Sequence, residues 1–235
     1  MAKVVSRRRK QTPRRRTNWV MIGGIFVVGA IALFALLFAT LQDQGAATAT
    51  PEAVLSLVEY CEANETNCVS KGSADAPVTV VEVSDYGCSH CRDFNLGGTA
   101  QAIDEEFVQT NQVRWIVLPY ASSQTTRPAA EASLCAADQD RYFEYHEGMF
   151  EQFGSAGAFS RDGILSAGRA AGVDLEEFET CIDEARHARA LQSNLTSAVG
   201  AGLRVTPTFF INGQRVEGNL PFASFRQQFE LALES

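Results

Sequence analysis

The sequence predicts an α/β domain preceded by a membrane-spanning helix, and three observations support this fold class. Residues 78–83 (VTVVEV) form a short β-branched run that is typical of a buried strand. Helical spacing follows over 91–107, and a second apolar run, 113–118, is expected to end at Pro119. Two strands joined through a helix imply a right-handed parallel crossover. Strand character then returns near the C-terminus, over 205–218.

The N-terminal region predicts one transmembrane helix. Residues 19–41 carry no charged side chain and are long enough to cross a bilayer. Residues 1–18 contain eight Lys and Arg and no acid, so we expect a basic cytoplasmic tail there. The catalytic part would then lie outside the plasma membrane, in an extracytoplasmic or periplasmic space. Residues 47–49 (ATA) resemble a cleavage site, which leaves removal of the segment open.

Charge and cysteine content indicate which binding partners and which cellular compartment fit this chain. The chain has 28 Asp and Glu against 20 Lys and Arg, and the basic tail takes eight of the latter. The remaining domain is strongly acidic, which argues against nucleic-acid binding. All six cysteines follow the predicted membrane segment, as expected for an oxidising compartment. They are Cys61, Cys68, Cys88, Cys91, Cys135 and Cys181.

Residues 42–74 are predicted to form a linker and a short helical lead-in. Residues 42–51 are rich in Ala, Thr and Gly, and 52–61 show helical spacing. Cys61 and Cys68 lie close together in the sequence, so a local disulfide is the simplest interpretation. The chain-entropy model gives such a bridge about 2–2.5 kcal/mol. A redox relay through this pair is the alternative.

The middle of the chain, residues 128–202, lacks strand character and is predicted as a group of helices. It opens with residues 128–137, a strong helix-forming stretch. Further helical stretches are expected at 141–153, 162–172, 175–187 and 188–199.

The C-terminal region predicts a hairpin followed by a helix. Asn212-Gly213 is a strong hairpin signal between residues 205–211 and 214–218. Residues 221–233 place phenylalanines on one helical face, which indicates a core-facing helix.

The most specific motif is the Cys-x-x-Cys pair Cys88 and Cys91, which lies where the first strand turns into its helix. Backbone N–H groups and the helix dipole at such a position stabilise the thiolate, the reactive form of cysteine. A zinc half-site is the first alternative, but zinc takes four ligands, no second such motif occurs, and His146 and His187 lack ligand spacing. A purely structural disulfide would close too short a loop to stabilise much. A redox pair without a metal is therefore favoured.

The order of these motifs resembles the thioredoxin superfamily, and the helical segment resembles its DsbA-like branch of extracytoplasmic thiol–disulfide oxidoreductases. Residues 84–91 (SDYGCSHC) and 206–213 (TPTFFING) carry the resemblance most strongly. It implies a thioredoxin fold interrupted by an inserted helical subdomain. The expected parts are residues 75–127, the insertion 128–202, and residues 203–235.

The resemblance also implies roles for the motif residues. Cys88 matches the exposed nucleophile and Cys91 the buried cysteine that resolves the mixed disulfide. His90 matches a residue that stabilises the Cys88 thiolate; the alternative is a solvated helix residue. Ser89 departs from the proline of the best-known members, which leaves the reduction potential open.

Two further positions match family features. Thr206-Pro207 matches the cis-proline beside the active cysteines, whose preceding residue binds an extended substrate through its backbone; an ordinary trans proline is the alternative. Glu82 matches a buried acid that moves protons for Cys91. Strand alternation offers the competing interpretation, in which Glu82 faces solvent.

Cys135 and Cys181 match the positions of a second disulfide in some family members. We interpret this bridge as structural, worth about 4 kcal/mol in the chain-entropy model. A free-thiol or regulatory role is the alternative.

The predicted function is donation of the Cys88–Cys91 disulfide to reduced client proteins. The resemblance implies a membrane quinone-linked partner for reoxidation and no cofactor. The alternatives are a reductase or isomerase of the same fold, for example in cytochrome c maturation, and a non-catalytic, membrane-tethered peptide-binding domain.

Overall fold

A five-stranded sheet lies at the centre of the computed structural model, which describes residues 51–234. The strand order is β1-β3-β2-β4-β5. Strands β2 and β3 are parallel, as predicted, and the other neighbouring pairs are antiparallel. The bounds are β1 Val69–Lys71, β2 Val78–Asp85, β3 Val113–Tyr120, β4 Thr208–Ile211 and β5 Gln214–Glu217.

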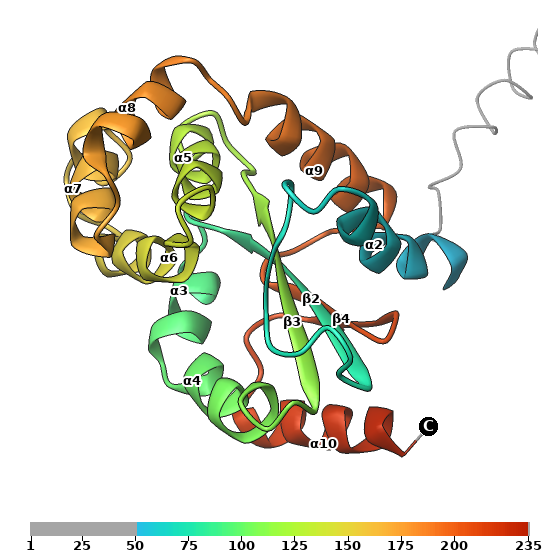
Figure 1. Ribbon diagram of the computed structural model, residues 1–235. Helices are drawn as coiled ribbons and strands as arrows, with labels where there is room; N and C mark the ends of the chain where they lie inside the picture. The colour runs from blue at the N-terminus through green and yellow to red at the C-terminus, as the bar shows by residue number, and fades with distance from the viewer. Residues whose placement is uncertain (1–50, 235) are drawn as a thin grey trace, which may run out of the picture. The chain divides into compact units, whose positions relative to one another are not determined.

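Helices surround this sheet, and Figure 1 shows α5 to α8 gathered on one side, away from α10. They are α2 Pro51–Ala63, α3 Ser89–Leu96, α4 Thr99–Ile103, a π-helical turn Asp104–Val108, α5 Arg127–Ala137, α6 Tyr142–Glu151, α7 Arg161–Ala171, α8 Leu175–Asp183, α9 Ala188–Gly200 and α10 Phe222–Leu233. Among the described helices, none has both the length and the apolar content needed to span a bilayer. The predicted tail, the transmembrane helix 19–41 and most of the linker lie outside the described residues.

The two faces of the sheet are both covered. On one face, Trp115 and Phe209 pack with Phe94 of α3 and Phe225 of α10. The opposite face includes Val81, Ile116 and Phe210 from the strands, with Leu57 of α2 and Ala198 of α9. Strand β2 is therefore buried along both faces, and alternation cannot bring its side chains to solvent.

The insertion forms its own apolar cluster. Tyr145 and Phe150 of α6 and Phe178 of α8 are fully buried in it. Tyr86 and Cys91 belong to the same cluster, so the inserted helices pack directly against the end of β2 and the start of α3.

Two sequence predictions on this scaffold are wrong. Strand β3 does not end before Pro119 but continues to Tyr120, because Pro119 lies beyond Val117, the last β3 residue that β1 pairs with. A proline is tolerated where no neighbouring strand needs its missing N–H. The helix predicted over 91–107 is broken after Leu96, where Gly98 adopts a φ of 88° that glycine tolerates best.

The lead-in contains a strand that the sequence analysis missed. Residues Val69–Lys71 pair with β3 as the edge strand β1. Three residues, two of them polar, are too few to show a strand period. The sheet therefore begins before residue 75, where the sequence placed the start of the domain.

Candidate active site

The turn between β2 and α3 presents Cys88 at the helix N-terminus. Cys88 is the N-cap of α3 and has an extended backbone. The buried carboxylate of Asp85 accepts hydrogen bonds from the backbone N–H of Gly87, at 2.9 Å, and of Ser122, at 2.7 Å. Asp85 therefore fixes the turn to the loop that follows β3. Sequence reasoning gave Asp85 no role, because its partner Ser122 is distant in the chain.

The loop before β4 approaches the same turn. The Thr206-Pro207 peptide is cis, and the Cys88 thiol donates a hydrogen bond to the Thr206 carbonyl oxygen over 3.1 Å. The fold thus brings together two motifs that are 118 positions apart. The backbone of Thr206 therefore lies against the Cys88 thiol.

The surroundings of Cys88 favour its thiolate. Its pKa is lowered to about 5, chiefly by a hydrogen bond with the Cys91 thiol. A hydrogen bond with the Thr206 side chain and hydrogen bonds from the backbone N–H groups of Cys91 and His90 act in the same direction, and partial burial opposes them. The His90 side chain itself is exposed. His90 thus contributes through its backbone, and a role for its imidazole stays a prediction.

Cys91 has the opposite character. Its side chain is fully buried, and burial raises the pKa of its thiol, with a further increase from the neighbouring Cys88. One helix turn therefore holds an accessible thiolate and an inner protonated thiol. Cys88 is therefore the residue suited to thiol–disulfide exchange with another molecule, whereas Cys91 is held as an unreactive, protonated thiol.

Glu82 lies beneath this helix. Its side chain is completely buried, so the competing interpretation that it faces solvent is wrong. Trp115 Nε1 donates to one carboxylate oxygen at 3.1 Å, and Asn95 Nδ2 lies 3.4 Å from the other. Burial raises the Glu82 pKa to about 7, and the hydrogen bonds only partly offset it. Near neutral pH this carboxyl can therefore both accept and release a proton.

Asn95 links this acid to the helix that carries the inner thiol. Its amide also donates to the Cys91 backbone carbonyl at 2.9 Å. The charge of Glu82 contributes to the raised Cys91 pKa, so the two side chains interact electrostatically. Sequence reasoning missed Asn95; its position one helix turn after Cys91 was the available signal.

The six cysteines all lie within the described residues, and their states differ. Cys88 and Cys91 are free. The remaining four form two disulfides, Cys61–Cys68 and Cys135–Cys181. The first closes the end of α2 onto β1, and the second joins α5 to α8.

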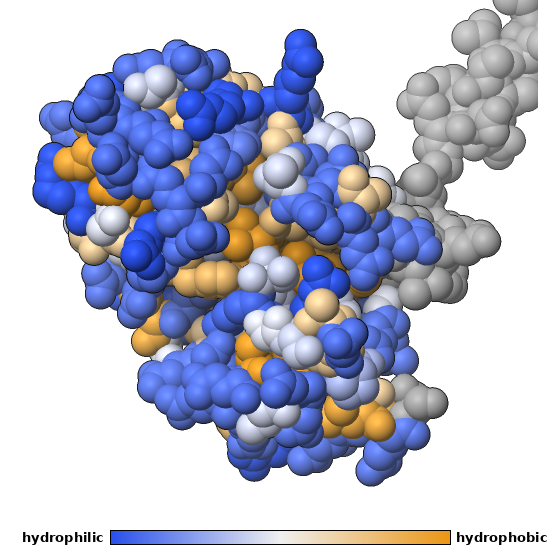
Figure 2. All heavy atoms as spheres, in the orientation of Figure 1, coloured by the Kyte–Doolittle hydropathy of each residue, from blue (hydrophilic) through white to orange (hydrophobic). Residues whose placement is uncertain are grey.

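The surface beside the site is partly apolar. Figure 2 shows one face of the molecule, with hydrophilic side chains over most of it and apolar side chains gathered across its middle. A hollow of about 150 Å³ lies beside the cis-proline loop, and Val205 next to it is 48% exposed. It is lined by Tyr120, Ser122, Leu203, Arg204, Val205 and Thr206.

Fold and site together define a protein that carries a Cys-x-x-Cys pair opposite a cis-proline on an α/β sheet with inserted helices. The family model described as Thioredoxin matches residues 63–230, so the chain belongs to this thioredoxin family. The resemblance to DsbA-like thiol–disulfide oxidoreductases is confirmed.

Two curated relatives differ in how much of their length is matched. The Na(+)/H(+) antiporter NhaA of Herminiimonas arsenicoxydans is 28% identical over 149 residues, which are 63% of this chain and 23% of that protein. Disulfide bond formation protein D of Bacillus subtilis is 23% identical over 169 residues, 69% of this chain and 76% of that protein. The chain thus spans about a quarter of the length of the antiporters that it matches.

Among solved structures, oxidised BdbD from Bacillus subtilis has the same fold, with a TM-score of 0.66. The two sequences are 21% identical, and the similarity covers 72% of this chain and 94% of BdbD. The two proteins therefore share a fold over most of this chain.

Proposed function

We propose that the protein is an extracytoplasmic oxidase that transfers the Cys88–Cys91 disulfide to reduced client proteins. The observation that carries this proposal is the unequal pair of thiols. A thiolate at Cys88 with a pKa of about 5 stabilises the reduced enzyme, and an enzyme whose reduced form is stable gives up its disulfide readily.

The transfer takes place in two exchange steps. A client thiolate attacks Cys88 Sγ of the oxidised enzyme, which forms a mixed disulfide and releases Cys91 as a thiolate. The buried Cys91 takes up a proton, for which Glu82 is the nearby exchange group. A second client thiolate then attacks the client sulfur of the mixed disulfide and releases Cys88 as a thiolate. The client loses two electrons, and the enzyme gains them.

Client binding follows from the same geometry. The cis-proline loop exposes the backbone of Thr206 beside Cys88, so an extended client segment can pair with it as an added strand. The exposed Val205 and the adjoining hollow offer apolar contact to the side chains of that segment. Such recognition is largely independent of sequence and suits many clients.

The proposal includes a membrane anchor at residues 19–41 and a quinone-linked membrane partner that reoxidises the dithiol. The uncharged segment, its basic flank and two disulfides in the domain support this location. A relative from Bacillus subtilis is named disulfide bond formation protein D, which supports this direction of transfer.

Two measurements on the full chain test the direction of transfer. Oxidised protein is mixed with a reduced, unfolded client, and regain of client activity is followed with Cys88→Ala as control. The Cys88–Cys91 potential is then measured against glutathione. We expect wild type alone to restore the client, with a potential well above the roughly −270 mV of thioredoxin. A thioredoxin-like potential, with insulin reduction but no client oxidation, would favour a reductase.

A further inference from the structure

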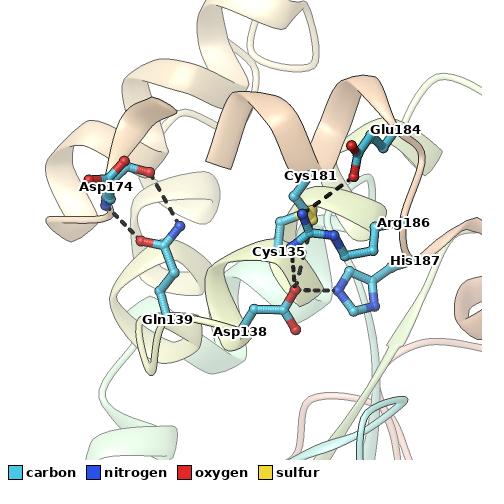
Figure 3. Close-up of polar contacts among 8 residues, drawn as sticks. All are labelled: Cys135, Asp138, Gln139, Asp174, Cys181, Glu184, Arg186 and His187. Carbon is cyan, nitrogen blue, oxygen red and sulfur yellow. Dashed lines mark hydrogen bonds and ion pairs between the residues drawn. A yellow bond between two sulfur atoms is a disulfide. The ribbon is translucent and has the colours of Figure 1, made fainter. Parts of the chain in front are cut away.

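Side chains of the types that bind metals surround the Cys135–Cys181 disulfide in the inserted helices (Figure 3). A ring nitrogen of His187 and both sulfur atoms lie within 4.8 Å of one another. His187 Nε2 lies 2.8 Å from Asp138 Oδ2, and the same oxygen lies 3.9 Å from Cys181 Sγ. The two sulfurs and the imidazole therefore lie together, and the Asp138 carboxylate borders the imidazole and one of the sulfurs.

Three separate elements supply these groups. Cys135 lies on α5, and Asp138 caps its C-terminus. Cys181 lies on α8, and His187 is the N-cap of α9. A cavity of about 120 Å³ reaches the cluster and is lined by both cysteines and His187. Small molecules and ions thus have a route to the sulfur atoms.

We propose that reduction of the Cys135–Cys181 disulfide converts this cluster into a zinc site. A dithiol reductant supplies two electrons and two protons, is oxidised to its own disulfide, and leaves two thiols on the protein. Binding of Zn²⁺ releases these two protons to solvent, and both thiolates bind the metal. His187 and Asp138 supply the third and fourth ligands. The oxidised protein should not bind zinc here, because a disulfide sulfur carries no negative charge and the thiolate is the form of cysteine that binds metals.

The distances suit zinc. Bond lengths of about 2.3 Å to sulfur and about 2.0–2.1 Å to nitrogen or oxygen give a tetrahedron with edges of roughly 3.3–3.8 Å. The two sulfurs and the His187 nitrogen lie within 4.8 Å of one another, and Asp138 Oδ2 lies 2.8 Å from His187 and 3.9 Å from Cys181. Rotation of these side chains would bring the four groups to such edges. A mixed set of thiolate and imidazole ligands is also the set that zinc prefers.

The charge around such a site is partly offset. Two thiolates and the Asp138 carboxylate around Zn²⁺ leave one negative charge. Arg186 Nη1 lies 3.5 Å from Asp138 Oδ2, and Arg186 Nη2 lies 3.4 Å from Glu184 Oε2. Asp138 and Arg186 are exposed, so solvent screens the remaining charge, while the two cysteines and His187 are buried.

The helices that carry Cys135 and Cys181 are also joined by hydrogen bonds that do not involve the disulfide. Gln139 Oε1 accepts from the Asp174 backbone N–H at 2.6 Å, and Gln139 Nε2 donates to the Asp174 carbonyl at 3.2 Å (Figure 3). This pair connects the end of α5 to the N-cap of α8. The two cysteine-bearing helices thus stay aligned when the sulfur–sulfur bond is opened.

The test uses the full chain with Cys61→Ser, Cys68→Ser, Cys88→Ser and Cys91→Ser, so that Cys135 and Cys181 are the two cysteines that remain. The protein is reduced with a phosphine, freed of it, and titrated with Zn²⁺ against a coloured chelator. We expect one zinc per reduced chain and none per oxidised chain. Co²⁺ should give a thiolate charge-transfer band in the reduced form only. Saturating zinc should raise the melting temperature of the reduced form by roughly 5–10 °C and leave the oxidised form unchanged.

Matched variants separate this site from incidental binding to thiols. In the same background, His187→Ala and Asp138→Asn should each weaken zinc binding at least about 10-fold. His90→Ala, which removes a histidine elsewhere, should leave it unchanged. Unchanged affinity in His187→Ala, or no zinc bound to reduced protein that circular dichroism shows to be folded, would overturn the proposal. A reduced protein that is unfolded and that zinc does not refold would overturn it equally.

Discussion

The molecule holds two cysteine pairs outside the lead-in, and their environments are opposite. Cys88 and Cys91 are free, lie on the first turn of α3, and include one half-buried thiol. Cys135 and Cys181 are bonded, almost fully buried, and join α5 to α8 across 46 positions. The same side-chain chemistry is thus used once at a surface turn and once inside a helical cluster.

This difference shows that the groups that surround a cysteine in space determine its chemistry. Backbone N–H groups and a second thiol hold Cys88 as a thiolate, with a pKa of about 5. Around Cys135 and Cys181 the neighbours are a histidine, a carboxylate and a guanidinium. The first set activates sulfur for exchange, and the second suits sulfur that is either bonded or bound to a metal.

The largest expected contrast is in activity. Cys88→Ala should lower the rate of insulin reduction by at least roughly 1,000-fold, because no other side chain can replace the nucleophile. Cys135→Ser with Cys181→Ser should change this rate less than about 2-fold at a temperature where the variant is folded. A large loss in the double variant would place the second pair in the reaction path.

Stability should show the reverse contrast. The Cys135→Ser and Cys181→Ser variant should lose about 4 kcal/mol of unfolding free energy, because the unfolded chain is no longer cross-linked over a long loop. The melting temperature should fall by roughly 10 °C. Cys88→Ser with Cys91→Ser serves as the control and should shift it far less. Equal shifts in melting temperature in the two variants would contradict a specific stabilising role of the Cys135–Cys181 disulfide.

The Glu82→Gln variant tests proton transfer at the inner thiol. Wild-type turnover in insulin reduction, where the Cys91 thiol must lose its proton, should rise as pH passes about 7, because Glu82 must ionise to accept that proton. The variant should be slower by up to roughly 100-fold above that pH and should lose this pH dependence. A profile that keeps its midpoint near pH 7 in the variant would exclude Glu82.

The same variant should gain stability at high pH. The Glu82 pKa is raised from 4.5 to about 7 in the folded state, so its stabilising contribution is full below about pH 4.5 and is lost as pH rises through 7. Replacing the ionised buried acid should therefore stabilise the protein by about 3 kcal/mol above pH 7. Denaturant unfolding at pH 5 and pH 8.5 measures the difference, and a variant that is less stable at pH 8.5 contradicts it.

The smallest expected effect concerns the Cys88 pKa. Alkylation of reduced wild type should have its midpoint near pH 5, and Cys91→Ala should move it upward by at least about one unit, because the strongest hydrogen bond to the thiolate is lost. Cys91→Ala should also accumulate mixed disulfides with clients, since no inner thiol can resolve them. His90→Ala, which keeps the backbone N–H, is the matched control. An unmoved midpoint in Cys91→Ala would show that the helix terminus alone sets the pKa.

Local signals in the sequence determined much of the architecture. The β-branched runs, the Asn212-Gly213 turn and the helical stretches predicted the strands β2 to β5 and the helices of the insertion, because these patterns report burial and backbone preference over a few residues. The reactive cysteine pair was also evident, since its two residues lie on one helix turn.

Only the tertiary structure decided which distant groups meet. It buried Glu82 by covering both faces of β2, joined Asp85 to Ser122, and brought His187 and Asp138 to the second disulfide. Sequence reasoning set His187 aside for lack of ligand spacing. Contacts between residues tens of positions apart leave no periodic trace in one sequence, because they depend on how whole elements pack rather than on their immediate neighbours.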